Sequence, residues 1–157
     1  MWESFEHVGW VVTLGTTGWL YNSVAVLHYL TMFWFIGSVA IVDLRIMGLA
    51  AGERNVAELG EQLFPWAWTG FVLSSIAGFL EFATAAGDWA PDPVFHVKLA
   101  MILISVIFTI IVQVGVKKWA LAAQIPTAAK IIACISLLLW IATIVTSSEI
   151  PALEGLG

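Results

Sequence analysis

The sequence predicts an all-α integral membrane protein, a four-helix bundle with a short N-terminal interfacial segment. Of the 157 residues, 61% are hydrophobic and only 11% are charged. The uncharged residues gather in four long runs, each close to the ~20 residues that a helix needs to cross a hydrocarbon core of ~30 Å. Several of the nine tryptophans, including Trp19, Trp89 and Trp119, lie near the ends of these runs. Aromatic side chains in those positions are typical of a membrane interface.

The first segment, residues 1–20, is expected to lie in the interface rather than to cross the bilayer. It is too short to span, and Gly15 and Gly18 interrupt it. The transmembrane bundle then covers residues 21–150, and a tail of residues 151–157 follows. Within the bundle, the predicted helices cover about 23–50, 63–86, 94–118 and 127–148.

Polar or proline-containing connections separate these helices. Residues 51–61 are polar, residues 87–93 form an acidic turn, and residues 117–126 end with a proline. Pro65 is expected in the first turn of the second helix, where its missing N–H costs nothing. At the end of the first helix, we expect Asp43 to pair with a lysine of the third helix.

Composition excludes several function classes. A single cysteine allows no disulfide framework within one chain. A net charge of −5 provides no basic stripe for nucleic acid, so no nucleic-acid partner is expected. Phosphate-binding loops, nucleophile elbows and zinc-protease motifs are all missing from the sequence, which favours a protein that is not a stand-alone enzyme.

The basic residues predict the orientation of the chain. Only Lys98 lies at the side of the membrane that holds the predicted termini. The other five lysines and arginines lie at the connections between helices 1 and 2 and between helices 3 and 4: Arg45, Arg54, Lys117, Lys118 and Lys130. The positive-inside rule places these connections in the cytoplasm. We therefore expect a multi-pass protein of the bacterial inner membrane with both termini in the periplasm.

Two histidines and a glutamate are predicted to share the outer half of the membrane. With this topology His28 and His96 lie on helices that run in the same direction. At ~1.5 Å per residue, both lie roughly 5–9 Å below the outer boundary. Glu81 of the returning helix reaches a similar depth. Polar residues at membrane depth are costly and are often functional, so this convergence is the strongest chemical signal in the chain.

Two imidazoles from facing helices are the axial ligands that haem b takes in a four-helix bundle. The predicted cofactor is therefore haem b, held between His28 and His96. Thr31 and Ala100 are small enough to leave space for a porphyrin on those two helix faces. Lys98 points roughly opposite to His96, so it would reach the haem propionates only at the edge of the site.

Two alternatives stay open from the residues alone. His28 and Met32 are four residues apart on one helix face, and imidazole with thioether suits copper, with His96 as a third ligand. The third possibility is a metal-free structural subunit of a larger membrane complex, in which each histidine simply hydrogen-bonds a carbonyl group.

The chain also resembles a family of small four-helix bacterial inner-membrane proteins that has no assigned function. That family looks distantly like the membrane domain of copper-resistance protein D. The likeness covers about residues 19–148 and includes His28, which matches the histidine of the family's first helix. It is carried by residues 19–21, 37–48, 65–71, 95–98 and 136–140. The resemblance implies the four-helix fold and a redox or metal-binding setting.

The sequence thus predicts a bis-histidine haem b protein that acts in electron transfer or in redox or haem sensing near the periplasmic face. Besides the lipid bilayer, its expected partners are further copies of itself or the subunits of a membrane complex, together with a periplasmic redox partner.

Overall fold

The computed structural model describes residues 6–50, 52, 54–122 and 124–154, with side chains as far as Ser147. Every element in these ranges is a helix, and none is a strand: α2 (Gly9–Thr16), α3 (Gly18–Met47), α4 (Val56–Thr84), α5 (Ala86–Trp89), α6 (Pro93–Ala120) and α7 (Thr127–Glu154). Four of them, α3, α4, α6 and the first 21 residues of α7, are long and apolar enough to cross a membrane. The predicted all-helical, multi-pass membrane fold is confirmed at this level.

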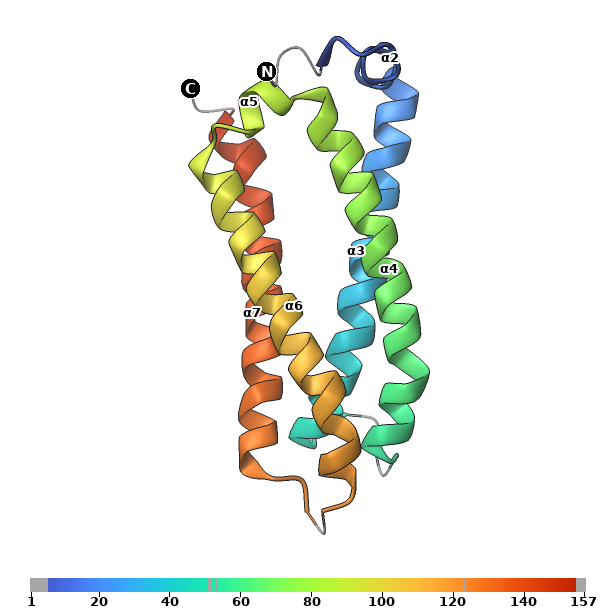
Figure 1. The fold of residues 1–157 in the computed structure, drawn as a ribbon, viewed down its shortest axis with the longest axis vertical. Helices are drawn as coiled ribbons and strands as arrows, with labels where there is room; N and C mark the ends of the chain where they lie inside the picture. Colours follow the sequence, from blue (N-terminus) through green and yellow to red (C-terminus); the bar gives the residue numbers. More distant parts are fainter. Residues whose placement is uncertain (1–5, 51, 53, 123, 155–157) are drawn as a thin grey trace.

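The four long helices form two hairpins that lie side by side (Figure 1). In the first hairpin α3 packs against α4, and in the second α6 packs against α7. Contacts of α3 with α7 and of α4 with α6 join the hairpins. The short helices α2 and α5 lie at one end of the bundle, called here the α5 end, and the connections between the helices of each hairpin lie at the other, called the loop end.

The two hairpins are joined most closely toward the loop end. A buried apolar cluster there takes residues from all four long helices, including Val42, Leu59, Val112 and Ala133. A second cluster lies nearer the middle of the bundle and contains Phe35, Ile36, Val39, Ala67 and Trp140. Among the described residues, both buried apolar clusters therefore lie in the middle of the bundle or toward the loop end.

The helix boundaries differ from the predicted ones where local capping decides them. Helix α4 begins at Val56, seven residues before the expected start, because the Asn55 side chain accepts a hydrogen bond from the Ala57 N–H at 2.8 Å. As a result Pro65 lies inside the helix rather than in its first turn. Helix α3 begins at Gly18, directly after a break at extended Thr17 that separates it from α2.

The charged groups at the loop end do not pair as expected. Lys117 forms an ion pair with Glu61 at 3.0 Å, and the Arg45 Nε donates to the Arg54 carbonyl oxygen at 2.7 Å. Asp43 is fully buried, and within the described ranges its two carboxyl oxygens have no hydrogen-bond partner. The expected pairing of Asp43 with a lysine of the third helix is therefore wrong, because the lysines remain at the surface and Asp43 faces the interior.

Candidate functional site

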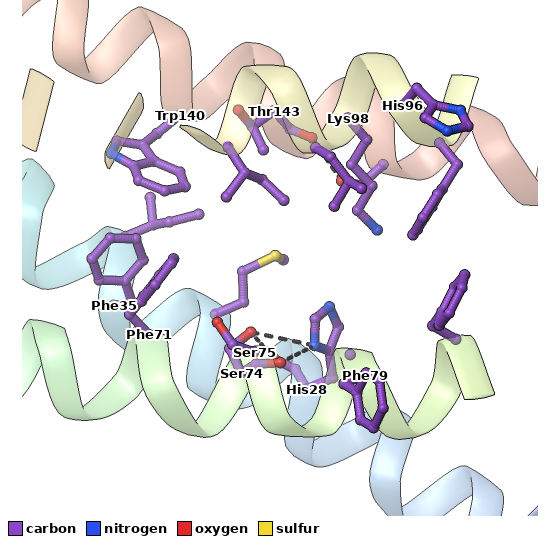
Figure 2. Close-up of a pocket in the computed structure, with 18 of the residues that line it drawn as sticks. His28, Phe35, Phe71, Ser74, Ser75, Phe79, His96, Lys98, Trp140 and Thr143 are labelled. Atoms are coloured by element: carbon purple, nitrogen blue, oxygen red, sulfur yellow. Dashed lines mark hydrogen bonds between the residues drawn. The ribbon is translucent and has the colours of Figure 1, made fainter. Parts of the chain in front are cut away.

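A cavity of about 510 Å³ lies between the hairpins in the half of the bundle toward the α5 end. All four long helices contribute to its walls (Figure 2). The lining is mainly apolar and aromatic, and its polar side chains are His28, Ser74, Ser75, His96, Lys98, Thr143 and Ser147. An apolar pocket of this size with a few converging polar groups is the usual form of a site for a small molecule or cofactor.

Aromatic rings close both ends of the cavity. Toward the middle of the bundle, Phe35 packs edge-on against Trp140 with ring centroids 4.7 Å apart, and it also contacts Phe71 at 5.1 Å. Toward the α5 end, Phe82 of α4 stacks on Phe95 of α6 at 5.1 Å with an interplanar angle of 11°. These contacts form a floor and a rim, so a flat ligand between them would meet aromatic surfaces at either end.

His28 projects from α3 toward the cavity, and its orientation is fixed by α4. Its Nδ1 lies 2.8 Å from the Ser74 carbonyl oxygen, which can only accept, so Nδ1 carries the hydrogen. In the neutral ring Nε2 is then the unprotonated nitrogen, and Figure 2 shows that nitrogen directed into the cavity. This is the arrangement of a metal-binding histidine, in which the second ring nitrogen is held by a carbonyl group.

A stripe of small residues on α4 lets the histidine ring fit between the helices. A Cβ added to Gly78 would lie 2.8 Å from Cε1 of His28, and one added to Gly70 would lie 3.0 Å from the Thr31 carbonyl oxygen. Ser74 lies midway between these glycines. Sequence reasoning missed this contribution, although small residues at four-residue spacing are a known signal for close packing of membrane helices.

The two candidate side chains of α6 take different directions. His96 is exposed at the rim of the cavity, where its Nδ1 lies 2.8 Å from the Asp92 carbonyl oxygen. Figure 2 shows its ring turned toward the outer end of the cavity and away from His28. Lys98 extends its ammonium group into the cavity across from His28. The expectation that Lys98 reaches only the edge of the site is therefore wrong, because α6 is rotated so that the face of Lys98 is turned inward.

Glu81 lies beside the same group of side chains. A smaller cavity of about 140 Å³ adjoins the main one, and His28, Glu81 and Lys98 all line it. Of the two imidazoles and one carboxylate expected to converge, His28 and Glu81 line this cavity together with Lys98, and His96 does not. A carboxyl group, an amino group and an imidazole therefore lie around one small cavity.

The remaining candidate residues differ in whether they line the main cavity. Met32, one turn after His28, lines the main cavity with it. Thr31 does not line the cavity: it is buried, its hydroxyl donates to the Leu27 carbonyl oxygen at 2.7 Å, and its own carbonyl faces Gly70 of α4. Ala100 is exposed and also lies outside the lining. Neither residue therefore provides the space expected for a porphyrin.

Within the described ranges, no group of three or more His, Cys, Asp or Glu side chains is arranged to hold a metal ion. Any metal in the main cavity would therefore depend on His28 with other kinds of ligand, or with a ligand that brings its own donor atoms, as a porphyrin does. Comparison of the chain with known protein families, curated proteins and solved structures found no match.

Proposed function

We propose that this chain binds haem b in the main cavity with His28 as an axial ligand. Its role would be electron transfer, or redox or haem sensing. The observation that carries the proposal is the orientation of the His28 ring: Nε2 is directed into an apolar cavity while Nδ1 is held by the Ser74 carbonyl group. A carbonyl group that holds Nδ1 leaves Nε2 as the nitrogen that can bind a metal.

The residues around His28 fit this group in three respects. The volume of about 510 Å³ is in the range of cofactor pockets, and the walls are mostly apolar. The aromatic floor and rim suit a flat macrocycle. Lys98 supplies a cation inside the cavity that would attract a propionate. Bound haem would supply one reversible electron, and His28 would hold the iron while the aromatic rings exclude water.

His96 is proposed as the second residue that would hold the iron, as the sequence suggested. Its side chain is exposed, with one hydrogen bond to the Asp92 carbonyl group and an edge-on contact with the Phe95 ring, and a change of rotamer would give up these two contacts. Lys98 is the competing ligand, since it already extends toward His28. Replacing each residue separately and comparing the low-spin spectra of the bound haem distinguishes the two.

The proposed setting is the bacterial inner membrane, with the α5 end at the periplasmic side. Five of the six lysines and arginines in the sequence lie at or near the loop end, which favours a cytoplasmic location for that end. The cavity would then lie in the outer leaflet, within reach of a periplasmic redox partner. The chain is proposed to act as an oligomer or as a subunit of a membrane complex.

Titration of the purified protein with haemin tests the proposal. We expect a Soret band that saturates at stoichiometric haemin and shifts on reduction. His28→Ala should abolish this saturable binding. His7→Ala should keep it, because His7 is exposed, precedes α2 in the sequence and does not line the cavity. A wild-type protein that shows only non-saturable haemin uptake, or equal binding by both variants, would contradict the proposal.

Copper binding is the second candidate, because Met32 lines the cavity together with His28. The two functions differ in their dependence on the thioether. Met32→Leu preserves apolar volume, so haem binding should change little while a copper site loses a ligand. Stoichiometric copper in the purified protein that is lost in both His28→Ala and Met32→Leu would favour copper over haem.

A further inference from the structure

Asp43 occupies an unusual position in the core at the loop end of the bundle. It lies on the last turns of α3 and is 0% exposed. Its neighbours along the inward face of α3 are apolar, with Val42 and Ile46 in the buried cluster between the four helices. In the described ranges, neither carboxyl oxygen has a hydrogen-bond partner. An isolated carboxylate in such surroundings is very costly, because burial disfavours its charged form.

A second unpartnered polar group faces Asp43 from the opposite hairpin. The Ser136 hydroxyl on α7 is also 0% exposed and has no hydrogen-bond partner within the described ranges. It is close enough to interact with the Asp43 side chain, although the present rotamers do not have hydrogen-bond geometry. Two orphaned polar groups close to each other in one apolar core need a common explanation.

Among the residues that the structure describes, no cation forms an ion pair with Asp43. Arg45, two residues along on α3, uses its Nε to bind the Arg54 carbonyl oxygen. On α6, Lys117 is paired with Glu61 of α4 at the surface. The other described charged side chains of this end, Arg54, Glu58 of α4, Lys118 of α6 and Lys130 of α7, are exposed rather than directed into the core.

We propose that Asp43 is a proton-binding site, neutral in the folded protein at neutral pH, whose proton is shared with Ser136. A protonated carboxyl group donates one hydrogen bond, and the Ser136 hydroxyl is the acceptor that faces it. The bound proton removes the buried charge, and a change of the Ser136 rotamer then lets a single hydrogen bond satisfy both groups. Carboxyl groups inside a membrane protein often carry protons for transport or redox coupling, and this site does not depend on which ligand fills the main cavity.

The structure also provides a polar stripe between this site and the main cavity. Ser136 is followed on the same side of α7 by Trp140 and Thr143, which both line the cavity. The Trp140 indole N–H donates to the Thr109 hydroxyl at 3.0 Å, and Thr143 lies 3.3 Å from the Ser105 hydroxyl. These buried groups make the core between Asp43 and the cavity less apolar than the rest of the bundle.

Infrared difference spectroscopy of the full-length protein in lipid tests the proposal. At neutral pH the wild type should show the carbonyl stretching band of a protonated carboxylic acid, and Asp43→Asn should remove it. Glu61→Gln is the matched control, because that carboxylate is ion-paired at the surface and should not contribute to the band. Ser136→Ala keeps the carboxyl group but removes its acceptor, so the band should remain and move to higher frequency.

Two results would overturn the proposal. One is a protonated-acid band that has the same intensity and frequency in the wild type, in Asp43→Asn and in Ser136→Ala. The other is a stabilisation of the wild type by Na⁺ that choline does not produce and that Asp43→Asn removes. This result would identify a cation site instead. If Asp43→Asn fails to fold, the frequency shift in Ser136→Ala still decides between a protonated and an ionised carboxyl group.

Discussion

The chemistry of the candidate site depends most on how a single imidazole is held. The Ser74 carbonyl group fixes the ring of His28 through Nδ1, and the Ser74 hydroxyl lies 3.3 Å from the same nitrogen. A histidine held in this way loses little side-chain entropy when its Nε2 binds a ligand, because the ring is already ordered. Substitutions that displace the ring should therefore weaken binding even when they leave His28 itself unchanged.

Gly78→Ala tests this dependence on ring position. The added methyl group would lie 2.8 Å from Cε1 of His28 and must push the ring away from its contact with Ser74. We expect haemin affinity to fall by about tenfold or more, equivalent to about 1.4 kcal/mol. Haemin titration measures the effect, with Gly37→Ala as the control, since nothing lies within 4 Å of a Cβ at Gly37. Equal affinities for the two variants would refute the assigned role of Gly78.

Lys98→Met tests whether the ammonium group recognises an anionic substituent. A hydrogen bond to a charged group contributes about 1.5–3 kcal/mol, so haemin affinity should fall by roughly 10- to 100-fold. The dimethyl ester of haemin lacks the propionate charges, and its affinity should be the same for wild type and variant. A similar loss for haemin and for its ester would show that Lys98 acts by ligation or packing rather than through propionate.

At the scale of helices, the uncharged runs were sufficient to predict the number and order of the spanning segments. The starts of α3 and α4 were less predictable. At α4, the Asn55 cap begins a helix within residues whose polarity suggests a loop. Rotation of each helix about its axis was not predictable either. Helix α6 is apolar on nearly all faces, so its sequence does not reveal that Lys98 points inward while His96 lies at the rim.

Gly70→Ala tests the close approach of α3 and α4. A Cβ there would lie 3.0 Å from the Thr31 carbonyl oxygen and 3.1 Å from the Phe35 backbone nitrogen. Backbone atoms cannot move aside as a flexible side chain can, so we expect a loss of about 1–3 kcal/mol in the free energy of unfolding. Unfolding in mixed detergent micelles measures it. If Gly70→Ala is as stable as Gly37→Ala, the packing of the first hairpin is looser than described.

At the scale of the whole molecule, two hairpins joined at the loop end leave a cavity between them at the α5 end. The same architecture gives the bundle one end rich in cations and another that holds the candidate site. The sequence predicted that asymmetry from the positions of the lysines and arginines. It could not predict the buried Asp43, because a carboxyl group near a helix end normally indicates a surface ion pair, and only the tertiary packing turns it inward.

Cysteine accessibility in intact cells tests the proposed orientation. In a Cys134→Ala background, Asp88→Cys in α5 should react with a membrane-impermeant thiol reagent from outside. Gln124→Cys, in the connection between α6 and α7, should react only after the cells are lysed. The reverse pattern would place the cavity in the cytoplasmic leaflet and would require a different redox partner.

The most direct test of the account is the haem b content of the protein purified from haem-replete bacterial membranes. If the cavity holds haem through His28, the wild type contains haem b in stoichiometric amount with a reducible Soret band, and His28→Ala protein from the same cells contains essentially none. Folded wild-type protein that is colourless and metal-free, or His28→Ala protein with the same haem content as wild type, would contradict it.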